Sequence, residues 1–238
     1  LAGCAAAISL AQNGKQVLLL GKEQAAHHKV CGEFISYEVA YYLDALGINL
    51  ESLGAKKIDN ICLIRGKKSV STKLPFQAYS LSRLVLDEAL LTLAKTEGVD
   101  VCRGIAVTGM HQKDFDWKVT WATGEASAKS LFLASGKHDV RGWKRPKGSQ
   151  NDLIAFKIHY RLKPDQIQEL SRQVEIFLFK DGYAGLEAIE DDKANFCLVV
   201  KKSRFAACGK NWDYLLQDLL TQTPYLADRL DGAVTDWA

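Results

Sequence analysis

The chain opens with small apolar residues followed by a fully apolar run. Residues 1–12 favour a helix, Gly14 supplies a helix stop, and Val17–Leu20 is apolar throughout, as a buried parallel strand requires. Residues 80–98 carry a leucine stripe typical of a second amphipathic helix, and Val99–Cys102 is the next strand candidate. This alternation predicts an α/β fold with a parallel sheet.

Antiparallel β structure is predicted around this unit. Residues 54–76 read as strands on either side of the basic turn 65–68, which is more typical of a solvated hairpin end than of a binding patch. A short helix is predicted for residues 38–46. A β-meander is predicted for residues 104–110, 117–121 and 130–134.

Beyond residue 148 the pattern changes to long strands with one polar and one apolar face. Such strands form a sheet that can cover a cavity on one side, and Pro164 begins a short helix between the first two. The apolar stripe from Trp212 to Leu230, broken at Pro224, indicates helices that pack on the core. The strands are predicted at residues 154–160, 174–179, 183–189 and 195–200.

Composition excludes several classes of protein. With 238 residues, 47% of them apolar, the chain can bury one large core or two small ones. A net charge of +3 is too small to indicate a nucleic-acid partner, and the longest apolar stretch, residues 1–11, is too short to span a bilayer. We therefore expect an ordinary globular protein, and its charge indicates no partner.

The cysteines and histidines indicate neither zinc nor disulfides. No pair of the six cysteines has CxxC spacing, which fits a reducing cytoplasm. His27 and His28 are neighbours, and neighbours on an extended chain point in opposite directions. The sequence therefore predicts no metal site.

Gly3 stands where a nucleotide-binding βαβ unit has the last glycine of its GxGxxG turn. A β-carbon there would hold the helix off the sheet and the backbone away from a cofactor's diphosphate. Such a site also needs a carboxylate after the next strand, and Glu23 is the nearest candidate, with a solvated loop charge as the alternative. Leu1–Cys4 also spells the cleavage box of bacterial lipoproteins, which is the competing interpretation.

The segment Lys29–Phe34 (KVCGEF) has no helical or strand periodicity, as in a loop held for contacts. Together with the glycine start, it resembles the loop after the second strand in FAD-dependent oxidoreductases of the geranylgeranyl reductase family, relatives of the aromatic-ring hydroxylases. The resemblance implies a Rossmann-like FAD-binding domain of the GR2 type, a parallel sheet plus a β-meander. It also implies a substrate domain built on an antiparallel sheet.

The resemblance also implies which residues contact the cofactor. The loop around Cys31 would lie beside the flavin ring, Arg83 at the head of its helix would reach the FAD, and the strand ending at Gly136 would approach a phosphate. Without the resemblance, Cys31 would be interpreted as a small buried residue and Arg83 as a surface cation. The cofactor candidates are Gly3, Glu23, Lys29, Val30, Cys31, Gly32, Arg83, Val107, Ser135 and Gly136.

The sheet beyond residue 148 would form the substrate pocket in such a protein. The pocket candidates are Lys157, His159, Tyr183 and Gly185, although a hydrogen-bonded sheet histidine is the simpler interpretation of His159. Gly182–Leu186 lacks the tryptophan that prenyl reductases and flavin halogenases carry nearby, which argues against halogenation. Ser135–Gly136 also replaces the Asp-Gly of the hydroxylases.

The basic segment Lys137–Lys147 has two interpretations. It is either a solvated crossover between domains or a surface for the phosphates of a nicotinamide dinucleotide. The FAD-binding domain is predicted at residues 1–53 and 79–147, and the substrate-binding domain at 54–78 and 148–238.

We therefore expect a cytoplasmic FAD-dependent oxidoreductase that passes reducing equivalents from NAD(P)H to an apolar or unsaturated organic substrate. The alternatives are an FAD-dependent monooxygenase of an aromatic or polyketide-like substrate, a non-catalytic fragment or binding module, and a sugar- or lipid-binding sheet domain. No proton donor is evident from the sequence. Peripheral membrane contact is expected only if the substrate is a lipid.

The chain reads as an internal piece of a longer flavoprotein. No segment of this sequence matches the first strand of the βαβ unit, and none matches the later Gly-Asp flavin-binding segment of related proteins. An apolar strand followed by Gly-x-Gly is the expected sequence ahead of Leu1.

Overall fold

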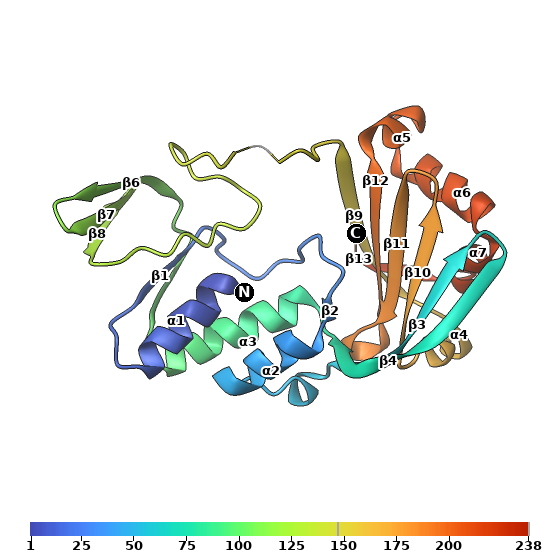
Figure 1. Cartoon of the computed structure of the whole chain (residues 1–238), viewed down its shortest axis with the longest axis horizontal. Coiled ribbons are helices and arrows are strands. Elements are labelled where there is room, and N and C mark those ends of the chain that lie inside the picture. Colours follow the sequence, from blue (N-terminus) through green and yellow to red (C-terminus); the bar gives the residue numbers. More distant parts are fainter. Residues whose placement is uncertain (147, 238) are drawn as a thin grey trace. The chain divides into compact units, whose positions relative to one another are not determined.

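The computed structural model describes residues 1–146 and 148–237 and consists of two compact units (Figure 1). Unit 1 comprises residues 1–27, 46–48 and 86–149, and unit 2 comprises residues 28–45, 49–85 and 150–238. Contacts within the chain thus group residues 28–45, 49–53 and 79–85 with unit 2, whereas the domain prediction grouped them with the FAD-binding part. The domain prediction concerns which residues bind the FAD and which bind the substrate, and it remains a prediction. Lys147 of the basic segment lies outside the described residues.

Unit 1 contains a small parallel sheet flanked by helices. Leu18 to Gly21 pair in parallel with Asp100 to Arg103, which confirms both predicted parallel strands. Leu18 is exposed, so β1 is less buried than an apolar run predicts. The elements of this sheet are α1 (Ala2–Gln12), β1 (Leu18–Gly21), α3 (Arg83–Thr96, shared with unit 2) and β5 (Asp100–Arg103).

The first helix lies against β1 at a point where only glycine fits easily. A β-carbon built on Gly3 would lie 3.2 Å from Cβ of Ala134 and 3.6 Å from Cδ1 of Leu19. The packing reason for a glycine at this position is therefore present in the structure.

The meander of unit 1 differs from the prediction in its third strand. Its strands are β6 (Val107–Lys113), β7 (Asp116–Trp121) and β8 (Gly124–Ala128). Residues 130–134 were predicted as a strand but form none, because the turn at Thr123 and Gly124 already returns the chain alongside β7. The segment before Gly136 is therefore extended coil, a correction to the predicted strand.

Unit 2 is organised on one mixed sheet of eight strands in the order β13-β9-β12-β11-β10-β3-β4-β2. All neighbours run antiparallel except β10 and β3, which are parallel. The strands are β2 (Phe34–Ile35), β3 (Lys56–Arg65), β4 (Lys68–Ser80), β9 (Leu153–Arg161), β10 (Gln173–Phe179), β11 (Gly182–Ala188), β12 (Ala194–Lys201) and β13 (Val234–Trp237).

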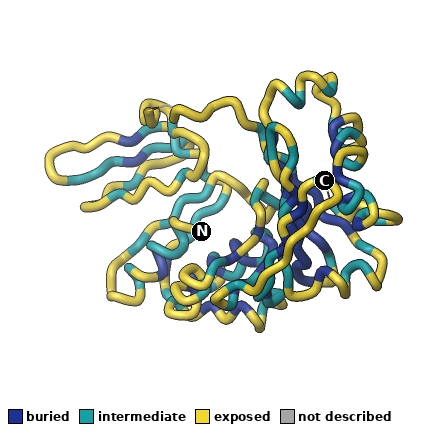
Figure 2. The backbone as a smooth tube through the Cα atoms, turned by 45° about the vertical axis from the view of Figure 1, so that its right-hand side comes forward, coloured by how far each residue is buried: buried dark blue, intermediate teal, exposed yellow. Residues whose placement is uncertain are grey.

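Helices cover one face of this sheet and enclose the main core. Leu215, Leu219 and Leu226 are fully buried against Phe177, Phe196 and other sheet residues. Figure 1 shows α5, α6 and α7 along the same side of β12, and Figure 2 shows the strands of the sheet as the most buried part of unit 2. The helices of unit 2 are α2 (Tyr37–Leu46, whose last residue belongs to unit 1), α4 (Pro164–Glu169), α5 (Lys202–Ala207), α6 (Trp212–Gln222) and α7 (Pro224–Arg229), with short 3-10 turns at Glu51–Leu53 and Glu190–Asp192.

Candidate functional site

The face of the sheet opposite the helices carries ionisable side chains from three adjacent strands. In the register of β9 and β12, His159 lies opposite Asn195 and Lys157 lies opposite Cys197. On the other side of β12, Glu187 of β11 lies opposite Asn195. Directly opposed residues share one face, and the alternate residues of these strands belong to the helix-covered core, so all five side chains point away from the helices.

Glu33, from the loop before β2, is the centre of this group. One carboxylate oxygen, Oε1, accepts hydrogen bonds from the backbone N–H of Arg83 (2.7 Å) and from Nζ of Lys157. The other oxygen lies 2.8 Å from Nε2 of His159. The side chains of all three ionisable residues are at least 99% buried. A buried carboxylate with three donors is a satisfied anion rather than an isolated charge.

The backbone of Glu33 is held in an uncommon conformation. Its φ is +56°, a left-handed value that costs a non-glycine residue free energy. Leu81 N–H donates to the Glu33 carbonyl at 3.2 Å, and the Glu33 N–H lies 3.4 Å from Sγ of Cys31. These contacts turn the carboxylate toward the first residue of α3, where the positive end of a helix favours an anion.

Lys157 and His159 together decide the charge of Glu33. Burial alone raises the pKa of Glu33, but the hydrogen bond from His159 and the charge of Lys157 outweigh it, so its pKa lies below the ordinary value. Glu33 is therefore a carboxylate at neutral pH.

His28 and Trp237 complete the group, which we call the Glu33 cluster (His28, Glu33, Lys157, His159 and Trp237). The ring of His28 lies 4.7 Å from that of His159 and 4.5 Å from that of Trp237, centroid to centroid. Lys157 Nζ lies 5.7 Å from the Trp237 ring centroid, within cation–π range. Burial and the neighbouring His159 and Lys157 lower the pKa of His28, which favours its neutral form.

A second carboxyl, Glu187, is in the opposite state. Its side chain is buried, and Asn195 Nδ2 lies 2.6 Å from its Oε1. No salt bridge reaches it within the described residues. Burial raises the pKa of Glu187 to about 8 and that of the adjacent Cys197 thiol to about 12. At neutral pH, Glu187 is a protonated carboxyl and Cys197 a thiol.

His28, Glu33 and His159 have the residue types of a metal site. Their ligand atoms lie within 4.8 Å of one another. Lys157, however, already neutralises Glu33, so a bound dication would leave two uncompensated positive charges in a buried place. On this charge balance we still expect no metal; this remains a prediction, which metal analysis of the purified protein tests.

An apolar strip continues the same sheet face beyond the ionisable residues. Leu63 lies opposite both Val70 and Ile176, and Ile176 lies opposite Gly185. The adjacent pair Leu178 and Tyr183 is also exposed. We call this surface the apolar strip (Leu63, Val70, Ile176, Leu178 and Tyr183). It offers an apolar ligand a broad contact beside a group of proton-bearing side chains.

The predicted pocket residues thus all lie on one sheet face. Lys157 and His159 belong to the Glu33 cluster, Tyr183 to the apolar strip, and Gly185 separates Glu187 from Ile176. His159 is also a hydrogen-bonded sheet histidine, the simpler interpretation.

The other candidates of unit 2 lie in the loop that carries Glu33 and at the start of α3. Cys31 is partly buried, and its carbonyl lies 3.5 Å from Nδ2 of Asn195. Gly32 has no atom within 4 Å of a built β-carbon, which leaves room for a ligand atom. Ser82 caps α3, its Oγ accepting from Val85 N–H at 3.2 Å, so Arg83 is the first helical residue. Lys29 is partly buried and Val30 exposed.

The cofactor candidates of unit 1 are more scattered. Glu23 is exposed in the loop after β1, and Val107 begins β6. Gly136 has a φ of +67° and no atom within 4 Å of a built β-carbon, and Ser135 precedes it. This open, left-handed glycine fits the close approach of a phosphate, as the resemblance implies.

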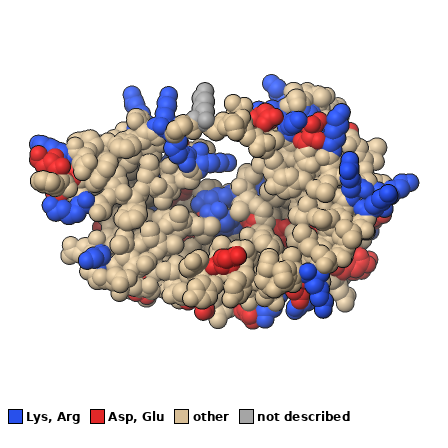
Figure 3. Space-filling model, viewed as in Figure 1, with Lys and Arg blue, Asp and Glu red and all other residues tan. Residues whose placement is uncertain are grey.

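The basic segment of unit 1 is anchored to the meander. Trp143 Nε1 donates to the Met110 carbonyl at 3.0 Å and its ring lies 5.5 Å from that of Trp117. Arg145 pairs with Asp139 at 2.9 Å. On the face drawn in Figure 3, the charged side chains are scattered among uncharged residues. A role in dinucleotide binding remains a prediction.

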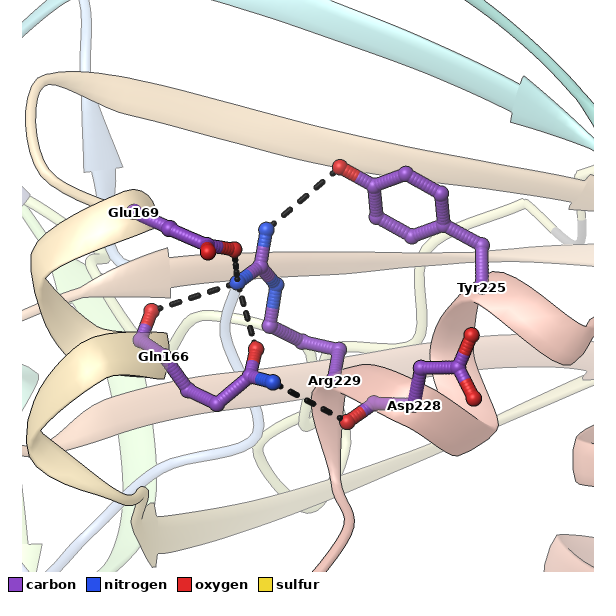
Figure 4. Close-up of a pocket in the computed structure, with 5 residues that line it drawn as sticks. All are labelled: Gln166, Glu169, Tyr225, Asp228 and Arg229. Carbon is purple, nitrogen blue, oxygen red and sulfur yellow. Dashed lines mark hydrogen bonds and ion pairs between the residues drawn. The ribbon is translucent and has the colours of Figure 1, made fainter.

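A pocket between α4 and α7 has a structural explanation. Arg229, which is buried, lines it and donates to Glu169 (2.9 Å) and Gln166 (2.6 Å), as Figure 4 shows, and also to Glu175 (2.7 Å), which the figure does not draw. Nε and both terminal nitrogens of the guanidinium have partners, so the pocket offers an anion no vacant donor. Arg229 ties α7 to α4 and β10.

Comparison with known proteins supports the fold. No family model matches the sequence, and no curated protein sequence matches it. Among solved structures, a flavoprotein/dehydrogenase from Cytophaga hutchinsonii matches 99% of this chain with a TM-score of 0.86 and 17% identity. The chain has the fold of flavin-dependent enzymes. The match covers 62% of that structure, so this chain spans less than two thirds of its length.

Flavin-dependent halogenases share the same fold. The halogenase CmlS matches 100% of this chain, with a TM-score of 0.84 and 20% identity over 46% of its own length. The halogenase PltM, in complex with phloroglucinol and FAD, matches 100% of the chain with a TM-score of 0.77 and 14% identity over 57% of its length. Identities this low show the fold and do not single out the geranylgeranyl reductase family.

Several residues of the site were not predicted from the sequence. Glu33 lies in the recognised KVCGEF segment, yet no periodicity marks it as buried. Trp237 and Asn195 reach the site only through the pairing of β13 and β12 with β9. The alternation of β11 could have indicated Glu187, since it shares a face with Tyr183 and Gly185.

Among the described residues, no helix is long and apolar enough to cross a membrane.

Proposed function

We propose that this chain is part of an FAD-dependent oxidoreductase that transfers reducing equivalents from NAD(P)H, through the flavin, to an apolar, unsaturated organic substrate. The fold of flavin-dependent enzymes supports the cofactor. The sequence resemblance at Lys29–Phe34 supports the same cofactor independently, because it rests on a loop motif rather than on overall shape.

One observation carries the substrate class. The apolar strip lies on the same sheet face as the Glu33 cluster and Glu187, so an apolar ligand on the strip meets ionisable groups at its edge. A site for a polar substrate would be expected to have exposed hydrogen-bonding groups where Leu63 and Leu178 stand.

The residues present fit a bound FAD. Gly32 and Gly136 leave space where a β-carbon would stand, and Gly3 permits the close packing of α1 that a nucleotide-binding unit requires. In such an enzyme the flavin supplies hydride transfer. This chain would supply binding at Gly3, Ser135 and Gly136, a fixed negative charge at Glu33, and an apolar surface that excludes water.

Oxidation of an aromatic substrate is the second candidate. The structure of PltM holds phloroglucinol together with FAD on the same fold, which supports an aromatic ligand on the sheet face. The two reactions differ in their need for oxygen and in the change in substrate mass.

The test uses the whole protein with FAD, NADH or NADPH, and geranylgeranyl diphosphate as the unsaturated probe. Reduction predicts anaerobic oxidation of the nicotinamide and a product heavier by two hydrogens for each double bond. Nicotinamide oxidation that requires oxygen, with a gain of one oxygen atom in an aromatic probe such as phloroglucinol, would instead favour the monooxygenase. Absence of flavin binding would favour a binding module.

A further inference from the structure

We propose that Glu187 is the proton donor of this site, with the acceptor being the substrate carbon that does not receive the hydride. The inference rests on the proposed function and adds the residue that the sequence did not identify. Three features of the sheet face lead to it: the pairing of Glu187, the space beside it, and the contrast with Glu33.

The partners of Glu187 suit a neutral carboxyl. Its near neighbour is the amide of Asn195, with Nδ2 at 2.6 Å from Oε1. Asn195 Oδ1 is buried and has no hydrogen-bond partner among the described residues. A protonated carboxyl can accept from Asn195 Nδ2 through Oε1 and carry its proton on Oε2. Asn195 Nδ2 also lies 3.5 Å from the Cys31 carbonyl, which fits this orientation of the amide.

The space beside Glu187 is provided by Gly185. A β-carbon built on Gly185 would lie 3.8 Å from Oε2 of Glu187 and 3.6 Å from Cδ1 of Ile176. Since Gly185 has no side chain, a ligand can approach its backbone more closely than at a residue with a β-carbon. A substrate carbon packed over Gly185 would have Ile176 of the apolar strip on one side and Oε2 of Glu187 on the other.

The two carboxyls of the face are in opposite states. Glu33 is an anion with Lys157 and His159 as donors, whereas Glu187 has no cation in a salt bridge with it within the described residues. Two carboxyls in one site, one protonated and one ionised because their environments differ, commonly serve as a proton donor and a fixed negative charge. The groups that act on Glu187 are Glu33, Lys157, Asn195 and Cys197, whose own pKa is raised in part by Glu187.

The reaction step balances with the groups named. A bound FAD, once reduced by NAD(P)H, would supply the hydride whose electron pair makes the first C–H bond. Glu187 would give its proton to the other carbon of the double bond, whose π electrons make the second C–H bond. Glu187 would then be a carboxylate and would regain a proton from solvent before the next turnover.

The test compares the wild type with Glu187→Gln in the whole FAD-loaded protein. Glutamine keeps the shape and the contact with Asn195 but has no acidic proton. With geranylgeranyl diphosphate as probe, oxidation of the reduced flavin should be slowed at least about 100-fold, the ordinary contribution of a general acid. Reduction of the flavin by NAD(P)H should be unchanged.

Glu190→Gln is the matched control. Glu190 is also buried, in the 3-10 turn two residues beyond the end of β11, and accepts from Ser82 N–H at 2.9 Å, which a glutamine oxygen can still do. This variant should oxidise its flavin at the wild-type rate. An equal loss in both variants would mean damage to the fold and would overturn the proposal.

Infrared spectroscopy gives a readout that does not depend on turnover. The wild type at pH 7 should show the C=O band of a buried protonated carboxyl that Glu187→Gln lacks. A wild-type rate in Glu187→Gln, or absence of that band, would overturn the proposal for Glu187. If the wild type still binds flavin and forms the hydrogenated product, the proposed function remains intact. A wild type that binds no flavin or forms no hydrogenated product would refute the proposed function itself.

Discussion

Glu33 is the residue on which the site's electrostatics depend. Among the described residues, Glu33 is the one carboxylate in a salt bridge with the buried ammonium of Lys157; it also accepts from His159 and has a left-handed backbone conformation. Buried pairs are weak evidence for stability as such, but removal of one partner leaves the other unpaired. The cluster is therefore sensitive to single substitutions.

Glu33→Gln should destabilise the protein by about 3–5 kcal/mol, because Lys157 is left as a buried unpaired charge. Urea unfolding measures the change. The double variant with Lys157→Met should recover part of the loss, since it removes the unpaired charge as well. Glu51→Gln, at an exposed pair with Lys57, is the control and should have a far smaller effect. Equal losses at the two sites would contradict the buried charge balance.

Glu187 predicts a definite pH dependence of stability. Its pKa is about 8 in the folded chain against 4.5 when solvated, so between these values the folded state holds one proton more than the unfolded state. The free energy of unfolding should therefore fall as pH rises from about 4.5 to about 8, by up to about 1.4 kcal/mol per pH unit. Unfolding midpoints across this range measure it. Glu187→Gln should lose this slope, and an unchanged slope would show that Glu187 is ionised.

For individual residues, the sequence predicted which side chains share a sheet face better than it predicted which side chains contact one another. Lys157, His159, Tyr183 and Gly185 were named together because the family resemblance implies a substrate pocket over this sheet, and the strand pairing places them on one face. Their role in a pocket remains a prediction. Glu33 was not named, because a loop residue has no periodicity and its burial depends on β9, more than a hundred residues away.

Among the elements, α7 is held in unit 2 by the buried side chain of Arg229 as well as by Leu226. Arg229 connects it to Glu175 on β10 and to Glu169 and Gln166 on α4. The guanidinium therefore fixes where α7 lies on the sheet.

Arg229→Ala should cost about 3–5 kcal/mol, because Glu175 would remain fully buried without a cation. Urea unfolding and limited proteolysis at α7 measure the effect. The double variant Arg229→Met with Glu175→Leu should be closer to the wild type. A double variant as unstable as Arg229→Ala would mean that α7 is lost for another reason.

In unit 1 the corresponding test concerns α1. Gly3→Val should weaken the packing of α1 on β1, because the β-carbon alone would lie 3.2 Å from Ala134. Thermal unfolding should show a loss of about 1–3 kcal/mol. Adding Ala134→Gly should restore part of it. Ala2→Val, at an exposed neighbouring position, is the control. A loss as large in that control would place the effect in helix propensity instead.

Strong periodicity explains which elements were predicted. The helices at residues 2–12, 37–46 and 83–96 and the long strands of unit 2 match their patterns. The third meander strand was displaced, because Leu131–Leu133 is apolar but β7 is already paired with β8. Helix α5 and strand β13 were missed, since each is short and β13 is defined by its partner β9.

For the molecule as a whole, the fold is that of flavin-dependent enzymes, and the chain spans less than two thirds of the solved structures reported above. Of the residues predicted to contact the cofactor, Gly3, Ser135 and Gly136 belong to unit 1, and the Cys31 loop and Arg83 belong to unit 2. The account as a whole therefore depends on one ligand, FAD.

The most direct test is the visible absorbance spectrum of the whole protein, purified with added FAD and freed of excess cofactor. The account predicts a yellow protein with about one flavin per chain, and loss of that flavin in Gly3→Val. A colourless protein that takes up no FAD would contradict it.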